Sequence, residues 1–163
     1  MAAYPFTTLR PQLGRVAAEG GGEKRDAITF SLSELEPRAT LADIPGLVTG
    51  AHANRGLGHA FLRHVERCGA LLLVVDLGAS PTAQLRMLRS ELAAYDASLA
   101  ARPTLVVGSK LDLPGARRAF AGLRRSAAAA GLPPPLGVSA SSQEGLAALR
   151  AAVLAVARGG VKA

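Results

Sequence analysis

Two short polar segments stand at the ends of apolar runs. Gly108–Asp112 (GSKLD) and Ser139–Ser141 (SAS) each follow three consecutive residues that are mostly apolar. A carboxylate such as that of Asp112 can accept two hydrogen bonds from guanine N1–H and N2–H₂, a donor pair that adenine lacks. The stem of Lys110 can lie flat on a purine, and backbone N–H groups of the second segment can reach guanine O6. Judged alone, the first segment could also be a solvated loop, and the second could also be a helix cap.

A third segment, Asp43–Gly46 (DIPG), also follows an apolar stretch. An aspartate at the end of a strand can hold Mg²⁺ through water, and the glycine N–H can meet a terminal phosphate. Alone, this pattern is most often a turn. The order T-T, D-x-x-G, S-K-x-D, S-A along the chain is more specific. The arrangement resembles the guanine-nucleotide motifs of small GTPases, and each segment follows a predicted strand, at the edge where ligands of open α/β sheets bind.

The elements that would position these segments alternate along the chain. Short apolar runs with period-2 or continuous character predict strands, and segments with 3.6-residue periodicity between them predict helices. Continuous apolar strands are typical of a parallel sheet covered on both faces. We expect strands at 13–17, 28–32, 39–44, 71–75, 104–108 and 136–138. We expect helices at 58–68, from Ser80-Pro81 along a stripe to Leu99, at 116–130, and after a Ser141/Glu144 capping box through Val156.

Composition limits the remaining classes. A chain of 163 residues with 49% apolar residues indicates one domain, here 1–158, with a frayed tail at 159–163. No apolar run approaches the roughly 18 residues of a membrane helix, and the single cysteine excludes an internal disulfide. The net charge of +7 favours anionic partners such as RNA, although an arginine-rich coding bias explains it equally well. We expect no DNA partner.

The first residues have the composition of a mitochondrial presequence but not its periodicity. No acidic residue precedes Glu19, yet Pro5 and Pro11 interrupt any amphipathic helix. We therefore interpret residues 4–16 as an ordered loop that runs into a strand, and recognise no targeting peptide in the chain.

The stretches around these motifs resemble the Obg family of GTPases over residues 4–157. Tyr4–Leu9 (YPFTTL) is similar to that family's first switch. Asp43–Glu66 (DIPGLVTGAHANRGLGHAFLRHVE) is similar to its second switch and the following helix. Within the family, Arg67-Cys68, Val74–Leu77 and Ala101–Pro103 most resemble the mitochondrial ribosome-associated members. The resemblance thus implies a three-layer, P-loop-NTPase-like G domain with a mostly parallel sheet and a mitochondrial matrix location.

The resemblance also implies roles for individual residues, in a site that binds GTP or GDP with Mg²⁺. It implies that Thr8 supplies the hydroxyl on Mg²⁺. We assign no catalytic residue. An apolar Leu47 after D-x-x-G implies slow hydrolysis that depends on a monovalent cation or on the ribosome. One departure is Ser109, where the family usually has asparagine. The nucleotide-binding residues implied are Phe6, Thr7, Thr8, Leu9 and Arg10; Asp43, Ile44, Pro45 and Gly46; Ser109, Lys110, Leu111 and Asp112; and Ser139, Ala140 and Ser141.

The sequence contains no G-x-x-x-x-G-K-[ST] phosphate loop. We therefore expect a truncated G domain from which the first strand, the phosphate loop and the first helix are absent, leaving two parts of the sheet with unpaired edges. Two functions stay open. One is a GTPase whose full-length form assists assembly of the mitochondrial large ribosomal subunit. The other is a nucleotide-incompetent fragment, inactive alone, that interacts with ribosomal RNA or protein through basic faces.

Overall fold

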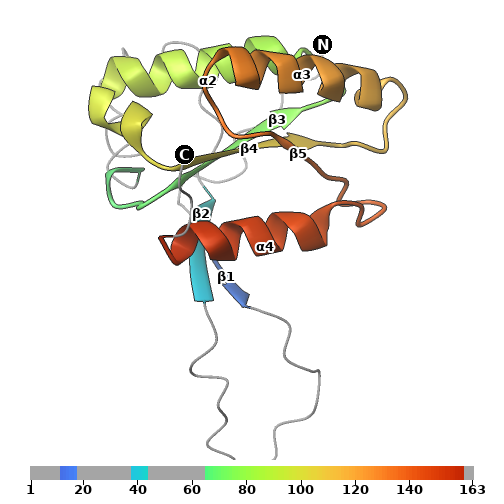
Figure 1. Cartoon of the computed structure of the whole chain (residues 1–163). Coiled ribbons are helices and arrows are strands. Elements are labelled where there is room, and N and C mark those ends of the chain that lie inside the picture. Colours follow the sequence, from blue (N-terminus) through green and yellow to red (C-terminus); the bar gives the residue numbers. More distant parts are fainter. Residues whose placement is uncertain (1–11, 18–37, 44–64, 160–163) are drawn as a thin grey trace, which may run out of the picture.

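A computed structural model describes residues 12–17, 38–43 and 65–159, and it arranges them as an α/β protein (Figure 1). The strands are β1 (Gln12–Ala17), β2 (Arg38–Asp43), β3 (Leu71–Asp76), β4 (Thr104–Ser109) and β5 (Leu136–Gly137). The helices are α2 (Pro81–Tyr95), the short 3₁₀ helix η3 (Ala97–Ala101), α3 (Ala116–Ala129) and α4 (Leu146–Ala157).

Three strands form a parallel sheet in the order β3-β4-β5. Leu71 lies opposite Thr104 across the first pair, and Val107 lies opposite Leu136 across the second. The central strand β4 is buried on both faces, with Val106 and Val107 each 1% exposed. The apolar runs therefore predicted these strands and their parallel pairing correctly, because a strand covered on both faces has no polar side.

Helices α2 and α3 lie side by side over one face of this sheet (Figure 1). Leu85 of α2, Leu123 of α3 and Leu99 of η3 are at most 1% exposed and pack with Leu73 and Val75 of β3. Helix α2 begins at a proline, whose missing N–H costs nothing in a first turn. This apolar cluster holds the carboxyl ends of β3 and β4 in place for the site described below.

Helix α4 covers the other face of the parallel sheet, and an antiparallel pair formed by β1 and β2 packs against α4 (Figure 1). Val153 and Leu154 of α4 pack with Ala39 of β2, and Leu105 of β4 lies against the same cluster. Within the described ranges, β1 and β2 form a sheet of their own, not hydrogen-bonded to β3, β4 or β5. The runs at 13–17 and 39–44 are therefore strands as predicted, but they pair antiparallel to one another.

Two expected helix boundaries were wrong. Helix α2 ends at Tyr95, and Leu99 reaches the core from η3 because the Asp96 carboxylate accepts the Ser98 N–H at 2.8 Å and starts a new turn. The Ser141/Glu144 capping box does not form. Helix α4 instead follows Gly145, which has φ +74°, and no side chain caps its first turn.

Some predictions lie outside the described residues. These are the strand at 28–32, nearly all of the helix at 58–68, and residues 160–163 of the tail. Among the described residues, no helix is both long enough and apolar enough to cross a bilayer.

Candidate functional site

The polar segments singled out in the sequence meet at the carboxyl ends of β4 and β5. Ser109 ends β4, and Lys110–Asp112 continue directly from it. Leu111 N–H donates to the Val138 carbonyl at 2.9 Å, which ties the loop after β4 to the end of β5. The parallel arrangement therefore brings together two segments that lie almost thirty residues apart in the chain.

A side-chain hydrogen bond joins the two segments. The Ser139 hydroxyl donates to Oδ1 of Asp112 at 2.5 Å and accepts the Ser142 N–H at 3.1 Å. Ser139 is completely buried, whereas Asp112 is exposed. The bond from Ser139 is the largest of the causes that lower the pKa of Asp112, and Ser141 and the charge of Lys110 lower it further. The structure thus holds an ionised carboxylate at the carboxyl-end edge of the sheet, and the buried Ser139 hydroxyl fixes its orientation.

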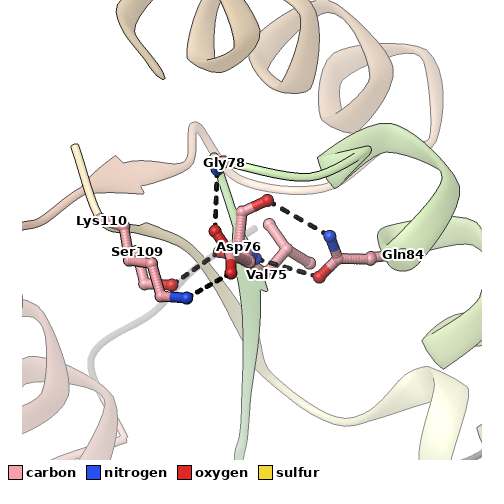
Figure 2. A network of polar contacts seen from close by, with 6 residues as sticks. All are labelled: Val75, Asp76, Gly78, Gln84, Ser109 and Lys110. Carbon is pink, nitrogen blue, oxygen red and sulfur yellow. Dashed lines mark hydrogen bonds and ion pairs between the residues drawn. The ribbon is translucent and has the colours of Figure 1, made fainter. Parts of the chain in front are cut away.

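A second polar network lies at the ends of β3 and β4 (Figure 2). The Lys110 ammonium contacts Oδ2 of Asp76 at 2.6 Å, and the Ser109 hydroxyl donates to the Val75 carbonyl at 3.0 Å. The hydrogen bond from Lys110 is the largest cause of the lowered pKa of Asp76. Lys110 itself has φ +62°, a conformation that non-glycine residues rarely adopt. Ser109, the last residue of β4, and Lys110, the first residue after it, are therefore both tied to the end of the neighbouring strand.

The loop after β5 is closed by backbone contacts. Ser139 N–H donates to the Glu144 carbonyl at 2.9 Å, and the Glu144 carboxylate pairs with Arg117 of α3 at 2.9 Å. A Cβ atom at Gly145 would lie 2.1 Å from the Gly137 carbonyl oxygen, so only glycine fits there. The Glu144 carboxylate, which a capping box would place on the Ser141 N–H, is therefore engaged with Arg117 instead.

The remaining predicted site residues are placed only in part. Asp43 ends β2 and is exposed, and it belongs to the two-stranded sheet rather than to the parallel one. The residues Phe6, Thr7, Thr8, Leu9, Arg10, Ile44, Pro45 and Gly46 lie outside the described residues, and with them the implied Mg²⁺ ligand Thr8. Among the described residues, no group of three His, Cys, Asp or Glu side chains could hold a metal ion.

Sequence reasoning missed Asp76 and Gln84 as members of the site. Asp76 ends an apolar run, and this position at the carboxyl end of a parallel strand was the available signal. Gln84 carried no such signal. Its amide reaches Asp76 because α2 folds back over the end of β3, where the side-chain Oε1 accepts the Asp76 N–H at 3.0 Å.

Known proteins are similar to this chain over most of its length. The family model described as 50S ribosome-binding GTPase matches residues 1–110. The chain is 50% identical over 135 residues to GTPase Obg of Desulforudis audaxviator, covering 80% of the chain and 28% of that protein. It is 43% identical over 159 residues to GTPase Obg of Anaeromyxobacter sp. (strain K), covering 94% of the chain and 40% of that protein.

A human protein is similar as well. Mitochondrial ribosome-associated GTPase 2 of Homo sapiens is 46% identical over 125 residues, covering 76% of the chain and 27% of that protein. The chain therefore spans between about a quarter and two fifths of the length of these relatives. Sequence motifs, the α/β fold and the family match agree: this chain belongs to the Obg family of 50S ribosome-binding GTPases and corresponds to part of their G domain.

Proposed function

We propose that residues 109–112 and 139–141 form the guanine-reading part of a GTP-binding G domain of the P-loop type. One observation carries this proposal: the exposed Asp112 carboxylate is held by the buried hydroxyl of Ser139, with Lys110 beside it. An ionised carboxylate with a fixed orientation accepts two parallel hydrogen bonds from guanine and offers nothing to the donor and acceptor pattern of adenine. Sites built on such paired bonds discriminate strongly, because a mismatched ligand leaves polar groups unpaired.

The residues that would contact the other parts of the nucleotide are assigned from family membership. In this proposal Phe6–Arg10 surround the phosphates, Thr8 binds Mg²⁺ and Asp43–Gly46 contact the terminal phosphate. Mg²⁺ bound with GTP would neutralise charge on the phosphates during hydrolysis. In the chain, the described residues contribute the base contacts and orient the nucleoside. The 163 residues hold no phosphate loop of the G-x-x-x-x-G-K-[ST] pattern, so we expect their own affinity for GTP and GDP to be weak.

For the whole protein we propose a GTPase that assists assembly of the large ribosomal subunit in mitochondria. The ribosomal part is supported by the family description and by the names of the relatives. The mitochondrial part is supported by the 46% identity to the human mitochondrial protein, and the bacterial GTPase Obg of Desulforudis audaxviator is 50% identical.

A second function has its own supporting observation. Arg118, Arg124 and Arg125 are exposed on α3, and the chain carries a net charge of +7. A basic helix face is the electrostatic footprint of RNA binding. The chain would then contact ribosomal RNA through α3, whether or not it binds nucleotide.

A titration followed by amide NMR tests the guanine proposal, because it detects millimolar affinities. We expect GDP to shift the resonances of residues 109–112 and 139–141, and ADP at the same concentration to leave them in place. Equal shifts from GDP and ADP, or none from either, would contradict the proposal.

The substitution Asp112→Asn provides a sharper form of this test. An amide at this position donates where the carboxylate accepts, so it matches the O2 carbonyl of xanthine instead of the N2 amine of guanine. We expect the preference to change from GDP to xanthosine diphosphate. An unchanged preference would show that Asp112 does not face the base.

A further inference from the structure

Asp76 belongs to neither of the guanine-reading segments, yet it holds a residue of one of them. Its Oδ2 lies 2.6 Å from the Lys110 ammonium, across the boundary between β3 and β4 (Figure 2). We propose that Asp76 is a positioning residue, which fixes the Lys110 side chain in the orientation that meets a purine base. This inference rests on the proposed guanine site and adds a residue that the motifs do not contain.

The Asp76 carboxylate is itself well anchored. The Gln84 amide clamps its backbone on both sides, because Oε1 accepts the Asp76 N–H at 3.0 Å and Nε2 donates to the Asp76 carbonyl at 3.2 Å. Oδ1 accepts the Gly78 N–H at 2.7 Å, while Oδ2 faces Lys110. The two carboxylate oxygens therefore have separate tasks: one holds the turn after β3, and the other holds Lys110.

Lys110 needs such an anchor. Its side chain is 56% exposed and has a flexible four-carbon stem. Without an anchor this stem samples many rotamers, and that freedom is lost when a ligand orders it. The ion pair is too exposed to stabilise the fold by much, since pairs in high dielectric contribute little. Its consequence lies in orientation. With the ammonium held by Asp76, the aliphatic stem is already ordered before a base arrives.

Asp76 also keeps Lys110 away from the wrong carboxylate. The charge of Lys110 contributes to the lowered pKa of Asp112, which places the ammonium within electrostatic reach of the base-reading group. Without the charge on Asp76, Asp112 remains as an anion that attracts Lys110. An ammonium bound there would compete with the guanine N–H groups for the same oxygens. Loss of Asp76 therefore weakens base binding in two ways, and both act through Lys110.

The substitution Asp76→Asn tests this directly, because the amide oxygen can still accept the Gly78 N–H while the charge is lost. We expect the dissociation constants of GDP and of guanosine, measured by amide NMR on the full chain, to rise about 3- to 10-fold, as ordering one long side chain costs. In a Lys110→Met background the same substitution is expected to have no further effect. Asp96→Asn is the matched control, since Asp96 is also a hydrogen-bonded aspartate with a lowered pKa but caps η3 instead.

A purely structural role of Asp76 would give a different result. Its loss would then weaken binding equally in the wild-type and the Lys110→Met backgrounds, and that outcome, or unchanged GDP binding by Asp76→Asn, overturns the inference. Circular dichroism checks that each variant is folded.

A measurement without nucleotide separates this inference from the proposed function. The Asp76 carboxyl carbon is titrated by NMR in the wild type and in Lys110→Met. We expect its pKa to rise toward the ordinary value when the lysine is removed, and an unchanged titration overturns the inference. If the pKa of Asp76 rises in Lys110→Met while no guanine ligand shifts the 109–112 resonances of the wild type, the proposed function is wrong, and the Asp76–Lys110 ion pair still stands.

Discussion

At the scale of single residues, the Ser139 hydroxyl is the main determinant of the candidate site. It uses its donor on Asp112 and an acceptor lone pair on the Ser142 N–H, so the hydroxyl bridges the loop after β4 and the loop after β5. Because Ser139 is completely buried, water cannot replace either bond without rearrangement. The orientation of an exposed carboxylate is therefore determined by a completely buried side chain.

Replacing Ser139 by alanine is expected to raise the pKa of Asp112 toward the ordinary aspartate value of about 3.9. In the wild type the folded-state pKa is lowered, so the contribution to stability is present above the unfolded pKa and lost as the pH falls through the folded one. Ser139→Ala should therefore lose stability near pH 7 and lose less of it on acidification between about pH 5 and pH 2. Chemical denaturation at several pH values measures both effects. Parallel pH profiles for the two proteins would contradict the assignment.

The sequence indicated which motif residues belong to the candidate site, but it did not indicate their hydrogen-bond and ion-pair partners. Asp112 and Ser139 were recognisable because each follows an apolar run in a fixed motif. The Asp76–Lys110 pair depends on strand register, which places Asp76 opposite Ser109, and register is a tertiary property. Ser109 shows the same limit: its type departs from the family's asparagine, and only the structure shows its hydroxyl on the Val75 carbonyl.

At the scale of elements, the loop between β5 and α4 depends on one glycine. Gly145→Ala would place a Cβ atom 2.1 Å from the Gly137 carbonyl oxygen and would also strain a backbone with φ +74°. We expect a loss of roughly 1–3 kcal/mol in the free energy of unfolding, together with weaker base binding. Urea denaturation measures the first of these.

Gly122→Ala is the matched control for this prediction. Gly122 lies within α3, and a Cβ atom there would meet nothing within 4 Å. Alanine in a helix interior is favoured over glycine, so this variant should gain about 0.5–1 kcal/mol. If both glycine variants changed stability in the same direction, the close contact at Gly145 would not be the cause.

Helix α3 carries a small basic face. Arg117 pairs with Glu144 at 2.9 Å, so the exposed arginines outside this ion pair are Arg118, Arg124 and Arg125. If these three arginines contact RNA phosphates, the logarithm of the binding constant should fall with the logarithm of the salt concentration. The expected slope is roughly −0.7 to −0.9 for each phosphate neutralised. We expect substitution of all three by glutamine to flatten that slope, measured by ribosomal RNA binding at several salt concentrations. Equal slopes would leave them as a solvated helix face.

Element boundaries show where sequence reasoning fails. The strands were predicted because buried apolar runs have a strong signature, yet the same runs do not tell which strand pairs with which. The antiparallel pairing of β1 with β2 was therefore missed. The stripe from Leu85 to Leu99 was continuous in sequence, and the local hydrogen bond of Asp96 to Ser98 N–H broke it into two helices.

At the scale of the whole molecule, the described residues form two sheets that share one covering helix. Helix α4 packs on β1 and β2 and also against Leu105 of the parallel sheet. The parallel sheet with α2 and α3 carries the larger apolar cluster, whereas Leu13 of β1 is 75% exposed. Side-chain packing therefore joins the two sheets, because no backbone hydrogen bonds connect them in the described residues.

This division has a consequence for hydrogen–deuterium exchange. Segments with few buried contacts open locally, while central strands exchange only when the whole domain unfolds. The amides of β4, hydrogen-bonded on both sides, should exchange most slowly, and those of β1 and β2 should exchange several orders of magnitude faster. Truncating Leu154 to alanine should speed exchange in β1 and β2 as well as in β4, because Leu154 packs with Ala39 of β2 and lies in the same cluster as Leu105 of β4. The pair of strands that ends at Asp43 would thus be an independently opening unit, which a bound partner could protect from exchange without altering the base-reading edge.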